Sequence, residues 1–176
     1  MSGVNFLEYA REEDIVHEVA LFGICDSPGE DPAFISYDQN TDEWIAEVKN
    51  SQQKKIQFLP VDKHIPLFRQ DGAELKRCDA MLLTSRLQTK DIIIFVELKD
   101  VKQSQVSGAR NYAVNQLRET IEAFSKGQDL HSYKERYAYA VNRIHPFANK
   151  ANTRDIYEFR KDHKVTLRFS RKIIFS

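Results

Sequence analysis

The feature that most constrains the fold is the apolar segment Ile92–Leu98, IIIFVEL, near the middle of the chain. Its first four residues are β-branched or aromatic and a valine follows, a composition that favours a β-strand. Apolar residues that run on without alternation are typical of a strand buried on both faces. The segment therefore predicts the central strand of a sheet that is covered on both sides.

Other segments predict the helices and strands around this one. Apolar residues at helical spacing predict a long helix over about 105–125, ending near Gly127. A similar spacing predicts a helix over 11–22, and Thr41 is expected to cap a second, short helix. A turn is expected at Asp71-Gly72 and a short helix near 152–160. Further strands are expected at Ile56–Val61, His64–Phe68, Cys78–Thr84, Tyr137–Val141, Val165–Phe169 and Lys172–Phe175. The last two of these are either separate strands or parts of one interrupted strand.

This order of elements predicts a single α/β domain over residues 1–176, with a mixed central sheet flanked by helices. A chain of this length can bury one substantial core. We expect the core of the domain at about 41–141. A helical extension over 1–40 is expected to precede it, and a basic α/β tail over 142–176 to follow it.

Composition argues against several classes of protein. No apolar run approaches the roughly 20 residues that a membrane helix needs. The first residues have neither the basic nor the apolar region of a secretory signal. The two cysteines, Cys25 and Cys78, lack the spacing of a zinc site or a disulfide framework. We therefore expect a cytoplasmic protein that does not contact a membrane.

The net charge is zero, but the charges are unevenly distributed. Residues 1–50 hold 12 acidic and 2 basic side chains, whereas residues 126–176 hold 12 basic and 5 acidic ones. Such asymmetry is expected when the basic part meets an anionic partner. The alternative is that the two ends of the chain face each other, within the fold or across a dimer.

Two acids and a lysine lie at the ends of neighbouring predicted strands. Asp79 is near the start of one strand, and Glu97 and Lys99 end the next, where the two-residue period puts them on one face. Seventeen residues separate Asp79 from Glu97, enough for a hairpin that brings the carboxylates together. Carboxylates suit Mg²⁺ or Mn²⁺, and the lysine can orient the attacking water or neutralise charge. The three residues predict a site for metal-dependent phosphodiester hydrolysis.

The pattern Cys78-Asp79 … Glu97-Leu98-Lys99, on consecutive predicted strands followed by a helix, resembles the PD-(D/E)XK nuclease superfamily. The resemblance implies a restriction endonuclease-like fold with an α-β-β-β-α-β core. It also implies that Asp79 and Glu97 are metal ligands and that Lys99 is catalytic. Cys78 stands where the name of the superfamily has proline.

The same resemblance implies two further contributions to the site. Many members carry a glutamine on the following helix, often before leucine, and Gln116-Leu117 is similar. An acidic residue on a helix before the first strand often completes the metal site. We expect that residue to be Glu47; the alternatives are Glu43 and, if the order of helices differs, Glu8 or Glu18.

Basic residues near the site and in the tail are candidates for phosphate contacts. They are Lys76, Arg77, Lys164, Arg168, Arg171 and Lys172. Flanking or solvated charges explain these residues about as well.

The leading expectation for function is a Mg²⁺-dependent nuclease, specifically a DNA endonuclease, and a homodimer is compatible with cutting two strands. An alternative is a non-catalytic nuclease-like module that binds nucleic acid or a partner protein. A third is a small interaction or immunity protein that uses its acidic first third as the binding face.

Overall fold

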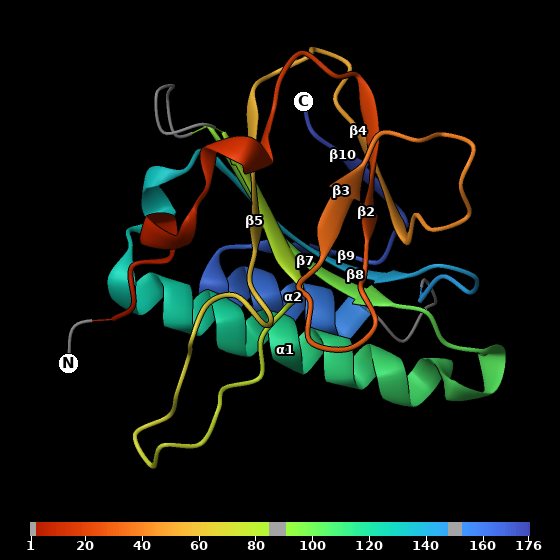
Figure 1. The fold of residues 1–176 in the computed structure, drawn as a ribbon. Helices are drawn as coiled ribbons and strands as arrows, with labels where there is room; N and C mark the ends of the chain where they lie inside the picture. Colours follow the sequence, from red (N-terminus) through yellow and green to blue (C-terminus); the bar gives the residue numbers. More distant parts are fainter. Residues whose placement is uncertain (1–2, 85–90, 148–152) are drawn as a thin grey trace.

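In the computed structural model, the described residues are 3–84, 91–147 and 153–176, and they form two sheets and two α-helices (Figure 1). The larger sheet contains, in spatial order, β1 (Ile15–Val16), β5 (Ile56–Pro60), β6 (Ala80–Thr84), β7 (Ile92–Lys99), β8 (Glu135–Asn142) and β9 (Thr166–Arg168). The smaller sheet contains β10 (Lys172–Ile174), β4 (Ala46–Lys49), β2 (Leu21–Cys25) and β3 (Phe34–Ser36). The helices are α1 (Val106–Gly127) and α2 (Thr153–His163), with short 3-10 turns at Phe6–Tyr9, Glu12–Asp14, Gln103–Gln105 and Leu130–Ser132.

The larger sheet is mixed, as the sequence predicts, and β7 lies inside it. β5, β6 and β7 form an antiparallel meander, after which α1 leads to β8, which runs parallel to β7. β9 then extends the parallel part. Every residue of β7 except Lys99 is buried, so the predicted central strand is confirmed.

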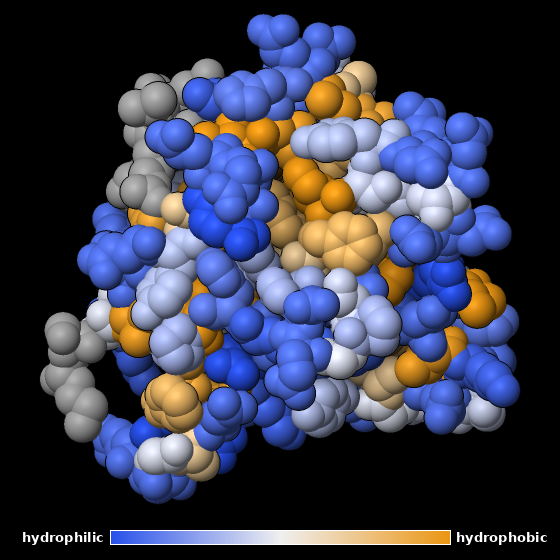
Figure 2. Space-filling model, viewed as in Figure 1, coloured by the Kyte–Doolittle hydropathy of each residue, from blue (hydrophilic) through white to orange (hydrophobic). Residues whose placement is uncertain are grey.

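The fold has three layers, because a different element covers each face of the larger sheet, which contains β7 (Figure 1). On one face, Ile93 and Phe95 pack with α1, and the ring centroids of Phe95 and Phe124 lie 5.6 Å apart in an edge-to-face arrangement. On the other face, Ile94 and Val96 pack with residues of the smaller sheet. Figure 2 shows apolar side chains gathered where the two sheets face each other, with hydrophilic side chains over most of the rest of that view.

The predicted helices in the first third of the chain are wrong. Residues 11–22 form a 3-10 turn and parts of two strands, because β1 pairs with β5 and β2 pairs with β3 and β4. The segment after Thr41 leads into β4, which pairs with β2 and runs parallel to β10. The helical extension over 1–40 and the first helix of the α-β-β-β-α-β core are therefore not found among the described residues.

Most later elements are confirmed. The long helix, the helix near 152–160 and the strands at β5, β6 and β8 are all present. The last two strands are separate and belong to different sheets. The strand expected at His64–Phe68 is wrong, since only an isolated bridge joins Phe68 to Glu74. The turn at Asp71-Gly72 is confirmed: Gly72 has a φ of +83°, and the Asp71 carboxylate accepts from the Ala73 amide at 3.0 Å.

Within the described ranges, no helix combines the length and the apolar character needed to cross a membrane.

Candidate active site

The antiparallel pairing of β6 and β7 brings the two predicted acids together. Asp79 directly precedes β6, and its neighbour Ala80 pairs with Val96, one residue before Glu97. Asp79 Oδ2 accepts a hydrogen bond from the Leu98 amide at 2.6 Å. Glu97 shares the face of Phe95, so its side chain lies on the side of the sheet that α1 covers, and Asp79 meets it at the edge where β6 begins.

Lys99 and Gln116 extend this cluster from the end of β7 to α1. The Lys99 ammonium donates to Glu97 Oε1 and also to Gln116 Oε1, the latter at 2.9 Å. The Gln116 amide nitrogen in turn donates to the Arg77 carbonyl oxygen at 2.8 Å. Gln116 therefore ties Lys99 to the chain segment that leads into β6, and the sequence-predicted residues Asp79, Glu97, Lys99 and Gln116 lie together.

The electrostatics of the cluster make it costly for both acids to be ionised at once when no cation is present. Burial raises the pKa of Asp79 to about 7, although the Leu98 amide and the Lys99 charge oppose this shift. Burial also raises the pKa of Glu97 well above its usual range, and the nearby Asp79 charge adds to this effect. A divalent cation between the two carboxylates would offset both costs.

The surroundings of Lys99 favour its charged form. Burial alone would lower the pKa of the Lys99 ammonium, but the charge of Glu97 and the hydrogen bond to it outweigh burial and raise that pKa. The side chain is therefore a cation in this state of the protein. It is held in place by Glu97 and Gln116 rather than by solvent.

One oxygen of the site has no partner. Glu97 is fully buried, and its Oε2 lacks a hydrogen bond within the described part of the chain. A buried carboxylate oxygen without a partner is costly, and either a proton shared with the Asp79 carboxyl or a metal ion would satisfy it. The described residues contain no group of three or more His, Cys, Asp or Glu side chains placed to hold a metal. The two carboxylates still suit Mg²⁺, which usually keeps several waters and accepts phosphate oxygens.

Glu47, the residue expected to complete the metal site, lies elsewhere. It is on β4, opposite Gly23 of β2 and Lys172 of β10. Its neighbours Ala46 and Val48 point into the core between the two sheets. Glu47 therefore points to the outer side of the smaller sheet, away from Glu97. The expectation depended on a helix at this position, and the segment is a strand. The alternatives Glu43, Glu8 and Glu18 are all exposed, and none of them lies on an α-helix.

Two other acids, which the sequence did not single out, act on Asp79. The charges of Asp26 and Asp62 both raise the pKa of Asp79. Asp26 directly follows β2, and Asp62 lies just beyond β5. Asp62 is also paired with Arg77, whose Nε lies 3.2 Å from its Oδ1. Asp26 is therefore the better candidate for an acid that acts on Asp79 from the smaller sheet, although the described residues do not gather it with Asp79 and Glu97 into a group placed to hold a metal. Its position after a strand end is the signal that could have identified it.

The two basic residues before β6 have different surroundings. Besides Asp62, Arg77 contacts Glu74 and donates to the Ile65 carbonyl oxygen at 3.0 Å, so its guanidinium is used within the fold. Lys76 is exposed, and its ammonium lies 4.5 Å from the centroid of the Tyr112 ring. The Lys99 ammonium lies 5.2 Å from the same centroid. Lys76 is thus the better placed of the two to meet a substrate.

The basic residues of the tail are spread over both sheets. Arg171 donates to the carbonyl oxygens of Ile45 and Trp44, at 3.1 and 2.8 Å, and so joins β10 to β4. Lys172 is paired in register with Glu47, which shows that the acidic and basic ends of the chain meet within the fold. The other two members of the predicted set, Lys164 and Arg168, lie just after α2 and at the end of β9.

Comparison with known proteins gave no match. No family model, curated protein or solved structure matches this chain. Function is therefore inferred from the geometry of Asp79, Glu97, Lys99 and Gln116.

Proposed function

We propose that this protein is a metal-dependent phosphodiesterase that acts on nucleic acid, specifically a DNA endonuclease of the PD-(D/E)XK type. The observation that carries the proposal is the meeting of Asp79, Glu97 and Lys99 at the ends of β6 and β7. A surface ion pair would not need a fully buried glutamate with an oxygen left without a partner. Raised carboxyl pKa values grouped around a lysine are typical of functional sites.

Asp79 and Glu97 would hold Mg²⁺ or Mn²⁺ through their carboxylates. Such an ion polarises the scissile phosphate and lowers the pKa of a bound water. Glu97 Oε2 is the oxygen available for this role, because Oε1 accepts from Lys99. Asp79 Oδ2 is oriented by the Leu98 amide, so the carboxylate position is fixed before any ligand arrives.

Lys99 would stabilise the negative charge that develops on the phosphate, and it would orient the attacking water. Its ammonium is already fixed by Glu97 and Gln116, so the side chain would not have to reorganise when charge develops on the phosphate. Gln116 is a positioning residue, since it holds Lys99 and is itself held by the Arg77 carbonyl.

A cleavage assay tests the proposal. Supercoiled plasmid, single-stranded DNA and RNA would each be incubated with the protein and Mn²⁺ or Mg²⁺. We expect one of these substrates to be cut, and Asp79→Asn and Lys99→Ala each to reduce the rate at least about 100-fold. Asp100→Asn is the matched control, because Asp100 is next to Lys99 in sequence but pairs with Arg143 at 2.7 Å.

One observation favours a second candidate, a nuclease-like module that binds without cleaving. The described residues hold two acids at the site but no third metal-ligating side chain in their group. Such a module would retain its affinity for nucleic acid in Asp79→Asn and Lys99→Ala, and the affinity would not depend on a divalent metal. Equal affinity with and without chelator, together with no cleavage by the wild type, would decide for this candidate.

A further inference from the structure

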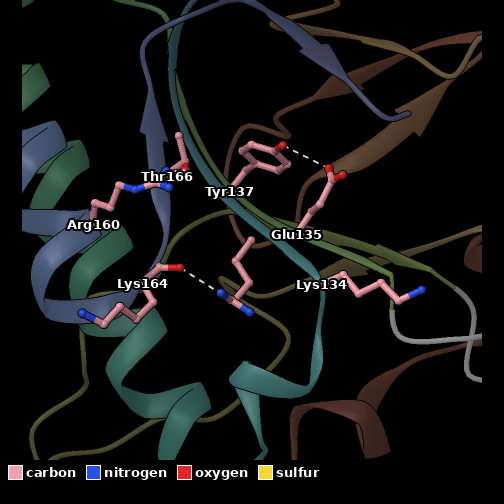
Figure 3. A pocket seen from close by; sticks show the side chains of 7 residues that line it. Lys134, Glu135, Tyr137, Arg160, Lys164 and Thr166 are labelled. Atoms are coloured by element: carbon pink, nitrogen blue, oxygen red, sulfur yellow. Dashed lines mark hydrogen bonds between the residues drawn. The ribbon is translucent and has the colours of Figure 1, made fainter.

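A second polar site lies at the opposite end of the larger sheet. It is a cavity of about 300 Å³ between α2 and the first residues of β8 and β9 (Figure 3). Its lining residues are Lys134, Glu135, Arg136, Tyr137, Arg160, Lys164 and Thr166. The parallel register pairs Glu135 with Ile92 and Asn142 with Lys99. The cavity is therefore seven residues along the strand from Lys99, about 23 Å at the usual rise of a parallel strand.

The charges around this cavity are unbalanced. Among the described residues, Arg136, Arg160 and Lys164 have no carboxylate within ion-pair distance, whereas Lys134 is paired with Asp91 at 2.9 Å. Glu135 is the one acidic residue of the lining, and its carboxylate accepts from the Tyr137 hydroxyl at 3.0 Å. The cavity thus retains positive charge that the fold does not neutralise.

Neutral oxygens hold the two arginines in place. Arg136 Nε donates to the Lys164 carbonyl oxygen at 3.0 Å, and its Nη1 donates to the Tyr133 carbonyl oxygen. Arg160 Nη1 donates to the Thr166 hydroxyl at 3.1 Å, and Figure 3 shows its side chain extended toward Thr166. Each guanidinium therefore keeps its full charge and has N–H donors that these hydrogen bonds do not use, and such donors suit phosphate oxygens.

Stabilisation of α2 does not explain this arrangement. Basic residues in the last turn of a helix do interact favourably with the helix dipole, and Arg160 and Lys161 lie there. Arg136, however, comes from β8 and reaches the chain just after the helix, so two separate elements bring guanidinium groups to one cavity.

We propose that this cavity binds the phosphate group of a small ligand, with Arg136 and Arg160 as its main donors and Lys164 at its rim. The size of the cavity is at the lower end of the range for ligand sites. Glu135 at the wall opposes any anion, so Arg136, Arg160 and Lys164 must outweigh its charge, and the limited volume of the cavity favours a free phosphate or pyrophosphate group. The inference does not depend on the function proposed for Asp79 and Glu97.

Calorimetric titration of the full-length protein with inorganic phosphate and pyrophosphate tests this inference. We expect saturable binding of pyrophosphate at low salt, about tenfold weaker in Arg160→Gln, because a charge-assisted hydrogen bond is lost. Lys172→Gln is the matched control: it removes the same charge from the smaller sheet and should leave affinity within about twofold. Arg136→Lys is a second variant, which keeps the charge but loses the fork of donors and should also weaken binding.

Two results would overturn the proposal. One is equal pyrophosphate affinity in Arg160→Gln and Lys172→Gln, which would show only a general response to charge. The other is the absence of saturable phosphate or pyrophosphate binding by the wild type while Arg160→Gln weakens binding of a short single-stranded DNA. That outcome would assign the arginines to a nucleic-acid backbone instead.

Discussion

The Asp79 carboxylate accepts a hydrogen bond from the Leu98 amide at 2.6 Å, so the residue before β6 is fixed against the end of β7. This contact places Asp79 beside Glu97 without the help of a cation. The two acids are therefore preorganised by the backbone. Burial raises the pKa of both carboxyls, and the Asp79 charge raises the pKa of Glu97 further.

Replacing Asp79 should stabilise the metal-free protein at alkaline pH. The folded-state pKa of about 7 exceeds the unfolded value of roughly 3.9, so the folded state binds the proton more tightly between these values. The stability from this group is complete below about pH 4 and is lost as pH rises through about 7. Asp79→Asn, whose side-chain oxygen can still accept from Leu98, should be more stable than wild type at pH 8 by about 1–3 kcal/mol. Urea denaturation with chelator at pH 5 and pH 8 measures this. A less stable Asp79→Asn at pH 8 would indicate a purely structural carboxylate.

Metal affinity should rise with pH for the same reason. A cation must displace the protons that the raised pKa values of Asp79 and Glu97 retain, so binding releases protons. Below pH 7, the affinity for Mn²⁺ should increase up to about tenfold per pH unit for each proton released. Calorimetry at pH 6 and pH 7.5, in buffers of different ionisation enthalpy, measures both the affinity for Mn²⁺ and the number of protons released. Affinity that is independent of pH would place the ion on other ligands.

Gln116→Leu should affect turnover more than substrate binding. Gln116 fixes the Lys99 ammonium and satisfies the Arg77 carbonyl, so the variant loses two hydrogen bonds at the site. We expect about 1–3 kcal/mol lower stability and a fall in kcat of about 10- to 100-fold with little change in KM. Steady-state kinetics on the cleaved substrate separate the two constants. A rise in KM alone would make Gln116 a substrate contact.

Arg171 and Lys76 should respond differently to substitution, although the sequence grouped both as candidates for phosphate contacts. Arg171 joins two strands through carbonyl oxygens, so Arg171→Met should lower the free energy of unfolding by about 1–3 kcal/mol. Lys76 is exposed beside Tyr112, so Lys76→Gln should leave stability unchanged while weakening nucleic-acid binding and reducing its salt dependence. Chemical denaturation and binding at two salt concentrations distinguish the two roles. Unchanged affinity in Lys76→Gln would remove Lys76 from the substrate surface.

The centre of the fold could be predicted because its signals are local. The unbroken apolar run of β7 and the helical period of α1 each specify an element without knowledge of its partner. Glu97, Lys99 and Gln116 lie on these two elements, so their proximity could be anticipated. Asp79 followed from the hairpin that joins β6 to β7.

The first third of the chain could not be predicted, because its structure depends on distant partners. Ile15 and Val16 have apolar neighbours at helical spacing, yet they pair with a strand about forty residues later in the sequence. The strand at Ala46–Lys49 pairs with β10 at the far end of the chain. Once these segments are strands, Glu47 points away from the site and the charge of Asp26 acts on Asp79, which helical periodicity alone could not reveal.

The most direct test of the central claim is a thermal melt of the wild type, Asp79→Asn and Asp100→Asn, each with chelator and with Mn²⁺. If Asp79 and Glu97 hold the ion, Mn²⁺ will raise the Tm of the wild type and of Asp100→Asn, since binding to the folded state stabilises it. Asp79→Asn should then show little or no rise. An equal rise in all three proteins, or no rise in any of them, would contradict a metal site at Asp79 and Glu97.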